Sequence, residues 1–398
     1  MIERTQVAIV GAGPAGLMLS HLLDLAGVRS VVFETRDRAY VEARVRAGVL
    51  EHGAAELLRA SGAGARMDRE GLVHRGIYLH FAGARHHIDF DELTGRTILV
   101  YGQQEVVKDL IAGRLEAGGD VRFEAEVAAV DARLGEIRYL QDQQERFVQA
   151  DLVGACDGSH GVGRRALEGV SVYEHVHPHS WLGILARTPP ASEELIYAYH
   201  DHGFALHSMR SPEISRLYLQ VSQDEDLAGW PEERIWEELR IRLGEPSLPQ
   251  GEILDVGITP MRSVVVEPMQ TARMFVAGDA AHILPPTGAK GMNLALADVA
   301  VLSVAMVEWF RSGSTAALER YSQDCANRVW RAQRFSSFMT SLLHRDAEGD
   351  PFEHRLRLAN LAYTVGSRAA AASLAENYVG AATDGVVFDP SLFNGVAR

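Results

Sequence analysis

The fold is decided by the stretch QVAIVGAGPAGLMLSHLLDLAGVRSVVFE, which covers residues 6–34. Residues 6–10 are apolar and rich in β-branched side chains, as in a buried parallel strand. The apolar spacing of Pro14–Ala26 predicts a helix, and Gly27 stands where a glycine commonly ends one. Residues 30–33 predict a second strand. The stretch therefore predicts a compact strand–helix–strand unit.

The turn between the first strand and the helix has the spacing of a dinucleotide-binding loop. Gly11, Gly13 and Gly16 form Gly-x-Gly-x-x-Gly, in which the glycines let a pyrophosphate approach the N–H groups of a helix N-terminus. Glu34 ends the second strand, where a carboxylate accepts hydrogen bonds from a ribose diol. A glycine turn beside a solvent-exposed glutamate is the alternative interpretation. The order of strand, loop, helix and acid favours nucleotide binding.

Composition narrows the class of protein. The chain has 398 residues, a formal net charge of −14, 47% hydrophobic and 23% charged residues. These values are typical of a globular protein of two or three units, and without a basic cluster we expect neither nucleic acid nor a membrane as partner. Two cysteines, Cys156 and Cys325, cannot form a disulfide framework. We see no signal peptide and no run of about 18 apolar residues, so we expect a soluble, cytoplasmic protein.

The remaining chain predicts a mixed architecture. Strands are predicted at 77–81, 87–90, 97–101 and 150–155 and over most of 181–270, and helices at 104–117, near 231–243 and over most of 291–398. We predict an α/β (mixed α+β) fold with a Rossmann-like nucleotide-binding domain at 1–174, from which 75–97 joins the next domain. A β-sheet substrate domain follows at 175–268, interleaved with the first. Residues 269–398 form an active-site loop and a helical C-terminal interface region.

Two further segments place an aspartate after a strand. Asp157 lies in LVGACDGSHGVGRR, residues 152–165, and Asp279 lies in RMFVAGDAAHILPPTG, residues 273–288. A strand that runs into such a turn exposes a carboxylate at the edge where ligands gather in open α/β sheets. Each segment alone could be an ordinary turn. Together with the glycine loop they indicate a nucleotide site.

Strand alternation groups four polar residues in the second half of the chain. Ser208 and Arg210 share one face of a predicted strand, and Arg216 and Tyr218 share one face of the next. Arg210 could fork onto a carboxylate, with hydrogen bonds from Ser208 and Tyr218. A half-exposed sheet with polar surface residues is the alternative.

The three nucleotide segments resemble those of the single-component FAD-dependent aromatic hydroxylases. The resemblance continues through residues 44–51, 68–74 and 375–380, and it is strongest to the members that act on 4-hydroxybenzoate. It covers essentially the whole chain except residues 131–149 and about the last dozen. The nucleotide segments specify only the superfamily, whereas the substrate-side residues specify the branch.

The resemblance implies the substrate and the residues that bind it. Arg210, Ser208 and Tyr218 fall on the family's carboxylate-binding positions, and Tyr197 corresponds to the tyrosine that contacts the phenolic oxygen. Tyr378 and His74 match a proton relay from that tyrosine, with His74 at its solvent end. Pro286 and Thr287 match the loop beside the flavin ring and substrate. The implied reaction converts 4-hydroxybenzoate and O2 to 3,4-dihydroxybenzoate through a flavin C4a-hydroperoxide.

The cofactor residues follow from the same resemblance. Glu34 should hold the adenosine ribose and Asp279 the ribityl chain, and Arg216 matches the residue that influences the flavin's swing between two positions. The other expected FAD positions are Gly11, Gly13, Ala15, Gly16, Arg46, Gln103, Asp157, Gly291 and Asn293. The start of the helix that carries Asn293 should favour an anionic reduced flavin.

The reducing cosubstrate is NADH or NADPH, with contacts expected from Arg44, His160 and Arg262. Familiar NADPH-specific members carry an arginine where Thr35 stands. Its loss and the presence of Asp37 favour NADH or dual use, although Arg36 and Arg38 could still meet a 2′-phosphate. The resemblance also implies a homodimer.

Two rival functions stay open: hydroxylation of another acid, such as 4-aminobenzoate or a dihydroxybenzoate, and a flavin-binding redox sensor without oxygenation. A metal site is a further alternative, because His175, His177 and His179 alternate along a predicted strand. No acid or cysteine partner accompanies them, so a solvent-facing strand is favoured and no metal is expected. Cys156 is interpreted as a small buried residue.

Overall fold

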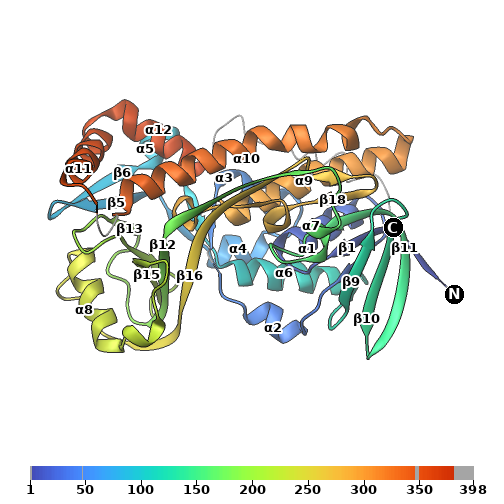
Figure 1. The fold of residues 1–398 in the computed structure, drawn as a ribbon, viewed down its shortest axis with the longest axis horizontal. Helices are drawn as coiled ribbons and strands as arrows, with labels where there is room; N and C mark the ends of the chain where they lie inside the picture. The colour runs from blue at the N-terminus through green and yellow to red at the C-terminus, as the bar shows by residue number, and fades with distance from the viewer. Residues whose placement is uncertain (1, 47, 346–348, 381–398) are drawn as a thin grey trace.

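The computed structural model describes residues 2–46, 48–345 and 349–380. Its strands form three sheets. Four long helices follow the last strand in the chain (Figure 1). This is the mixed α/β fold that the sequence predicts. The end of the predicted C-terminal region, residues 381–398, lies outside the described residues, as does residue 47.

The first sheet carries the glycine loop. β1 (Glu3–Val10), the loop, α1 (Pro14–Leu25) and β2 (Ser30–Phe33) follow one another as predicted. The strand order is β17-β18-β11-β1-β2-β8, in which β1 pairs in parallel with both β2 and β11. The other members are β8 (Asp120–Arg122), β9 (Glu126–Asp131), β10 (Glu136–Gln141), β11 (Gln144–Ala155), β17 (Gln270–Thr271) and β18 (Met274–Val276).

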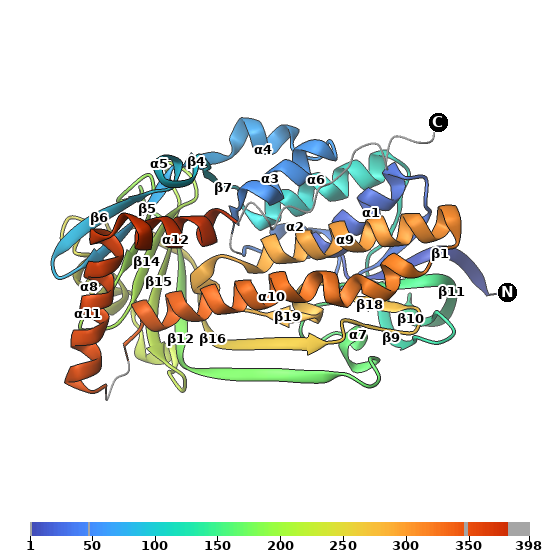
Figure 2. The same ribbon diagram turned by 90° about the horizontal axis from the view of Figure 1, so that it is seen from above.

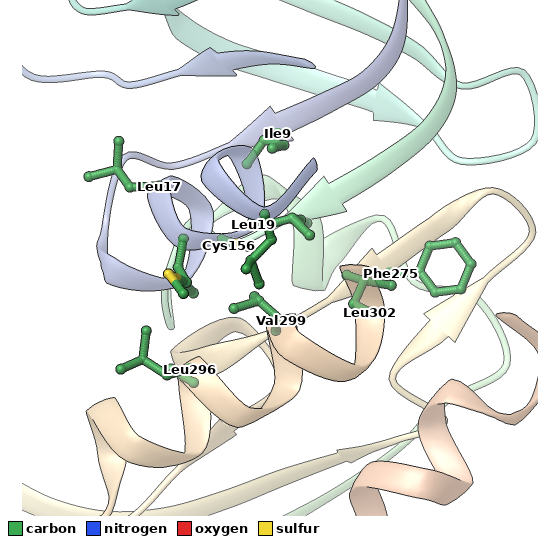
Figure 3. Packing of buried hydrophobic residues seen from close by; sticks show 14 of the residues in the cluster. Ile9, Leu17, Leu19, Cys156, Phe275, Leu296, Val299 and Leu302 are labelled. Atoms are coloured by element: carbon green, nitrogen blue, oxygen red, sulfur yellow. The ribbon is translucent and has the colours of Figure 1, made fainter. Parts of the chain in front are cut away.

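The half of the molecule that contains the first sheet has its own hydrophobic core, which is formed by this sheet, α1 and α9 (Gly291–Ser312). Ile9, Leu19 and Val299 meet there from β1, α1 and α9 (Figure 3). Gly154 of β11 permits the close approach of α1, because a Cβ atom at this position would lie 2.7 Å from Leu19 Cδ2. Cys156 belongs to the same core, and burial raises the pKa of its thiol, which confirms a packing residue.

The second sheet lies in the other half of the molecule and has the order β19-β16-β12-β15-β14-β13-β5-β6. Two long antiparallel strands, β12 (Ser171–Arg187) and β16 (Glu252–Glu267), run side by side toward the first half (Figure 2). β5 and β6 bring residues near 75–97 into this sheet. The remaining members are β5 (Gly76–Phe81), β6 (Ala84–Asp89), β13 (Leu195–Ala198), β14 (Ala205–Met209), β15 (Ser215–Ser222) and β19 (His282–Ile283).

α8 (Glu232–Leu243) covers one face of the second sheet through Trp236 and Leu239. β3 (Val49–Leu50), β7 (Ile98–Val100) and β4 (Leu72–His74) form a small antiparallel sheet, in which β7 confirms the strand predicted at 97–101 whereas β3 and β4 were not predicted. The shorter helices are α2 (Arg38–Ala43), α3 (His52–Ala60), α4 (Ala65–Glu70), α5 (Phe90–Thr94), α6 (Gln103–Glu116), α7 (Val162–Arg165), η1 (Leu227–Gly229), η2 (Gly278–Ala280) and η3 (Pro286–Gly288).

The C-terminal helices are α9, α10 (Ala316–Leu343), α11 (Pro351–Gly366) and α12 (Arg368–Val379). α9 corrects one expectation, because it is long and apolar enough to cross a membrane, although 67% of that window is buried inside the protein. Asn293, Asp298 and Ser303 interrupt its apolar sequence, so a search for an unbroken run overlooks it. The domain boundaries stay predictions.

The three histidines of β12 require a second correction. His177 and His179 are buried, not solvent-facing. His177 Nε2 lies 3.2 Å from the Ser263 hydroxyl, and His179 Nδ1 lies 3.1 Å from the Gln220 amide. Side chains of neighbouring strands therefore satisfy both rings. No group of three metal-binding side chains is found among the described residues.

Candidate active site

The glycine loop is shaped as a cradle in which side chains would collide. Gly11 has φ +98°, and a Cβ atom there would lie 2.5 Å from the carbonyl oxygen of Cys156. A Cβ atom on Gly16 would lie 2.0 Å from the Gly11 carbonyl oxygen, whereas one on Gly13 would meet open space. Ala15 is buried in the first turn of α1. The loop thus leaves the N-terminus of α1 open to a pyrophosphate, as FAD requires.

Glu34 lies beside this loop, at the end of β2. Its Oε2 accepts a hydrogen bond from the backbone N–H of Ala12 at 2.9 Å, and its Oε1 accepts one from the N–H of Arg36 at 2.9 Å. The carboxylate is thereby fixed at the loop. It keeps lone pairs for a ribose diol, since each carboxylate oxygen can accept more than one hydrogen bond.

Asp157 closes the turn after β11, the strand beside β1. Its Oδ2 accepts a hydrogen bond from the Gly163 N–H at 2.8 Å. Burial raises the pKa of the Asp157 carboxyl group, although hydrogen bonds from backbone N–H groups act to lower it. Oδ1 is buried without a partner among the described residues. A Cβ atom on Gly161 would lie 2.0 Å from the Asp157 side chain. Asp157 therefore shapes the turn and has one oxygen left.

Asp279 lies in η2, exposed at the junction of the two halves. Arg164 stabilises this turn through two hydrogen bonds. Its Nη2 donates to the Asp279 carbonyl at 2.6 Å, and its Nε donates to the Ala280 carbonyl at 2.8 Å. Burial and, to a smaller extent, the positive charge of Arg44 lower the pKa of the Arg46 guanidinium, whereas the nearby Asp279 carboxylate raises it. The structure thus brings Arg44, Arg46 and Asp279 together at one edge.

A buried hydrogen-bonded pair of side chains supports the same turn. His282 Nε2 lies 2.6 Å from Asp298 Oδ2, and this oxygen also accepts the Gly278 N–H at 3.1 Å. His282 is 1% exposed and Asp298 0%. Sequence reasoning singled out His282 only as part of a segment and missed Asp298 entirely. The only available signal was an acid inside an otherwise apolar helix.

The predicted carboxylate-binding residues do share one face of the second sheet. Leu206 pairs with Tyr197 on one side and with Tyr218 on the other, and Ser208 pairs with Arg216. Directly paired residues and those two apart point to the same side of a sheet. A Cβ atom on Gly183, opposite Tyr218 in β12, would lie 2.9 Å from Arg216 Nη2, so the glycine makes room for this cluster. Arg216 Nη1 also donates to Asp255 at 3.2 Å.

Arg210 has the clearest need for a ligand. Its Nε and Nη1 are buried and have no hydrogen-bond partner among the described residues. Burial lowers its pKa, and the nearby Tyr218 hydroxyl opposes this. Ser208 is buried, and its hydroxyl makes only a 3.5 Å contact with the Met209 carbonyl. A buried guanidinium without an acceptor is costly unless an anion pairs with it.

The two predicted relay tyrosines are in contact. Tyr197 of β13 and Tyr378 of α12 are each 1% exposed, and their hydroxyl oxygens lie 2.6 Å apart. Burial raises the pKa of both phenols above the usual value. Both groups are therefore neutral near pH 7, and the pair can pass a proton without a permanent charge.

His74 differs from its expected position at the solvent end of the relay. The residue is 2% exposed, and neither ring nitrogen has a partner among the described residues. Burial lowers its pKa to about 4, with Glu194 opposing this and Arg210 adding to it. His74 is therefore neutral at pH 7 and able to accept or donate one proton.

The loop before α9 brings further residues to the relay. Lys290, which sequence reasoning missed, lies with its Nζ 2.6 Å from Glu51 Oε1 and 3.0 Å from the Tyr378 carbonyl. Asn293 uses its side-chain amide inside the protein, accepting from the Glu51 N–H and donating to the carbonyls of Val49 and Ala289. The backbone N–H groups at the start of α9, near Gly291, are without an intrahelical partner and so are available to a cofactor.

Five predicted residues have less distinctive surroundings. The Thr287 hydroxyl lies 3.0 Å from that of Thr340 in the buried η3 turn, whereas Pro286 is exposed. Gln103 begins α6 and is half-buried. Of the expected nicotinamide contacts, His160 is exposed and Arg262 lies 3.6 Å from Glu174.

Two features indicate the class of protein. The glycine loop forms a dinucleotide-binding cradle, and the second half of the molecule presents a buried arginine, Arg210, whose Nε and Nη1 have no acceptor among the described residues, together with the buried phenols Tyr197 and Tyr378. This combination indicates a flavoprotein that acts on an acidic aromatic compound. The sequence model described as "FAD binding domain" matches residues 4–336. The chain is 42% identical to p-hydroxybenzoate hydroxylase of Acinetobacter baylyi, across 95% of each chain. It therefore belongs to the family of FAD-dependent aromatic monooxygenases, as the sequence segments indicated.

More distant comparisons agree on the fold. A 3-(3-hydroxy-phenyl)propionate/3-hydroxycinnamic acid hydroxylase of Comamonas testosteroni is 24% identical, over 76% of this chain and 52% of that one. The crystal structure of p-nitrophenol 4-monooxygenase from Pseudomonas putida superposes with a TM-score of 0.85 at 17% identity and covers both chains completely. A complex of aklavinone-11 hydroxylase with FAD and aklavinone gives a TM-score of 0.75 at 20% identity, covering 89% of this chain and 73% of that one.

Proposed function

We propose that the protein hydroxylates 4-hydroxybenzoate at C3 to give 3,4-dihydroxybenzoate, with FAD as cofactor, O2 as co-substrate and NAD(P)H as reductant. The observation that carries this proposal is the buried Arg210 guanidinium, whose Nε and Nη1 have no acceptor among the described residues, beside Tyr218 on the side of the sheet that presents Tyr197. A substrate with a carboxylate at one end and a phenol at the other satisfies both. The substrate named for the 42% identical relative supports the same choice.

Arg210 binds the carboxylate in this proposal, with Ser208 and Tyr218 as further donors. Tyr197 receives the substrate's phenolic oxygen, and Tyr378 and His74 carry its proton away. Ionisation makes the ring electron-rich at the position ortho to the phenol, where the oxygen atom is added. When bound and reduced, FAD would activate O2 and so provide the oxygen atom that is added to the ring.

The protein around the relay excludes water. Phe90 packs on Tyr378 with ring centroids 4.9 Å apart, and Phe335 contacts it edge-on at 6.1 Å. Each of these rings is nearly inaccessible to solvent. A dry pocket prevents the loss of a reactive oxygen species to water and strengthens the hydrogen bond between the two phenols.

For the reductant, we propose NADH or both nicotinamides. Arg38 is paired with Glu42 at 2.6 Å, and the Arg36 guanidinium lies 5.2 Å from the Tyr40 ring centroid. Asp37 accepts the Tyr40 N–H at 2.8 Å and caps α2, so it has a structural use besides repelling a phosphate. A kcat/KM for NADH equal to or above that for NADPH would support this proposal, and strict NADPH use would refute it.

We also propose a cytoplasmic homodimer. α11 exposes Phe352, Leu356 and Tyr363, at 69%, 44% and 65%, and this spacing places them on one face. An exposed apolar stripe of this kind is typical of a protein interface. Size-exclusion chromatography with light scattering should give twice the 43.6 kDa chain mass, and Leu356→Glu should give the monomer. Cell fractionation tests the compartment.

The function is tested with the FAD-loaded protein and three candidate acids. NAD(P)H oxidation should accelerate strongly with 4-hydroxybenzoate and less with 4-aminobenzoate or 2,4-dihydroxybenzoate. Peroxide without hydroxylated product would indicate that another acid is the true substrate. No acceleration by any of these acids would refute the proposal and leave a flavin redox sensor.

A further inference from the structure

A cavity of about 130 Å³ lies between α3, α9, α10 and α12. Neither the glycines of the dinucleotide loop nor Arg210 are among its lining residues. Its apolar wall includes Leu57, Leu294 and Phe335, from three different helices. The Phe335 ring offers an aromatic ligand a stacking or edge contact.

Cations outnumber acids around this cavity. Arg96, Lys290 and Arg328 line it, and Glu51 is the one acid among its described lining residues. Glu51 is already paired with Lys290 at 2.6 Å. Arg96 donates to the neutral carbonyl of Gly380 at 3.0 Å. The cavity is therefore positive, and it would attract an anion.

Arg328 is the cavity residue with buried donors, Nε and Nη1, that have no acceptor among the described residues. An acceptorless guanidinium in a confined site is costly, and a carboxylate with its two oxygens matches the guanidinium fork. The same argument, applied to Arg210, identified the first carboxylate site.

We propose that this cavity is a second binding site for a small aromatic carboxylate, with the carboxylate on Arg328 and the ring against Phe335. We expect a lower affinity than at the Arg210 site, where Ser208 and Tyr218 are further donors, because here the buried donors without an acceptor among the described lining residues belong to Arg328 alone. The ligand class rests on the geometry of this cavity and does not require that the protein be a hydroxylase.

The site lies next to the proton relay. Phe335 contacts Tyr378 edge-on, and Lys290 lies with its Nζ 5.1 Å from the Phe335 ring centroid and 3.0 Å from the Tyr378 carbonyl. A ligand here therefore rests on side chains that also pack against Tyr378. Such a site would let the concentration of an aromatic acid act on the catalytic half of the molecule.

Equilibrium dialysis of radiolabelled 4-hydroxybenzoate against the full-length FAD holoenzyme tests the proposal. We expect two molecules bound per chain at millimolar ligand, with the flavin absorbance change complete after the first. Arg328→Met should weaken the second binding step at least tenfold and leave the first unchanged. Ala332→Leu, which fills the cavity but keeps Arg328, should also remove the second step.

The matched control is Arg320→Met, which removes an exposed arginine from the same helix outside the cavity. It should leave both steps unchanged. One molecule per chain in the wild-type protein, or a second molecule that survives both Arg328→Met and Ala332→Leu, would overturn the proposal. A missing first step would instead contradict the proposed function, so the two failures are distinguishable.

Discussion

The hydroxyl oxygens of Tyr197 and Tyr378 lie 2.6 Å apart, although the two residues are separated by 181 positions in the sequence. Neither ring can reach bulk water, and burial holds the pKa of both phenols above the usual value. This contact joins the second sheet to the last helix. In the proposed reaction it carries a proton away from the substrate.

Tyr378→Phe should interrupt that path while leaving the fold intact, because it removes one oxygen and no carbon. We expect the rate of product formation to fall by about 10²-fold, the usual contribution of one proton-transfer group, with little change in substrate affinity. Stopped-flow measurement of hydroxylation and of substrate binding separates the two effects. Tyr363→Phe, at an exposed position on α11, is the control and should leave both unchanged.

Arg210→Met should weaken binding of 4-hydroxybenzoate by about 10²-fold, because a charged, buried hydrogen-bonding group is lost. The same substitution removes a buried charge without a partner, so the substrate-free protein should unfold at a higher temperature. Binding titration and thermal unfolding together check this opposite pair of effects. A variant that loses both affinity and stability would show that Arg210 is a structural residue.

Asp298→Ala should release the turn that carries Asp279, because the carboxylate holds both the Gly278 N–H and His282. Loss of one partner of a buried pair costs about 3–5 kcal/mol. We expect weaker FAD retention and a lower free energy of unfolding, measured by gel filtration and urea titration. Asp298→Asn keeps an acceptor for Gly278 and should restore part of the FAD affinity, whereas Asp324→Ala, at an exposed position of α10, should change neither.

The pKa of His74 predicts how stability depends on pH. Burial lowers this pKa to about 4 in the folded protein, whereas the unfolded chain protonates near the ordinary value of about 6.5. The unfolded state therefore binds the extra proton first, so the free energy of unfolding falls as pH drops from about 6.5 to about 4 and changes little above. His74→Gln should flatten this part of the urea midpoint profile. His160→Gln, at an exposed position, should leave the slope as in the wild type.

The nucleotide half of the protein could be predicted closely because its signals are local. β1, the glycine loop, α1 and β2 lie within residues 3–33, and each element follows from apolar periodicity and glycine placement. Strand alternation also placed Ser208, Arg216 and Tyr218 on one face, as the observed pairing shows. Because side chains alternate between the two faces of a strand, sequence spacing alone is sufficient to assign these residues to one face.

Other features depend on contacts between distant segments, which no local pattern encodes. Lys290 meets Glu51 across 239 positions, and Asn293 gives its amide to the backbone of β3 instead of leaving it for the cofactor. His74 is buried because β4 pairs with β7, and β4, with three residues, is too short to show a periodicity. The buried histidines of β12 were misjudged for the same reason, since their partners come from neighbouring strands.

The central claim is tested most directly by the amount and identity of product formed per reductant consumed. FAD-loaded protein is incubated with limiting NADH or NADPH, excess 4-hydroxybenzoate and O2, and the products are separated by chromatography. We expect close to one 3,4-dihydroxybenzoate per NAD(P)H oxidised, with no 2,4-isomer. Reductant consumption that yields hydrogen peroxide and no 3,4-dihydroxybenzoate would contradict the account.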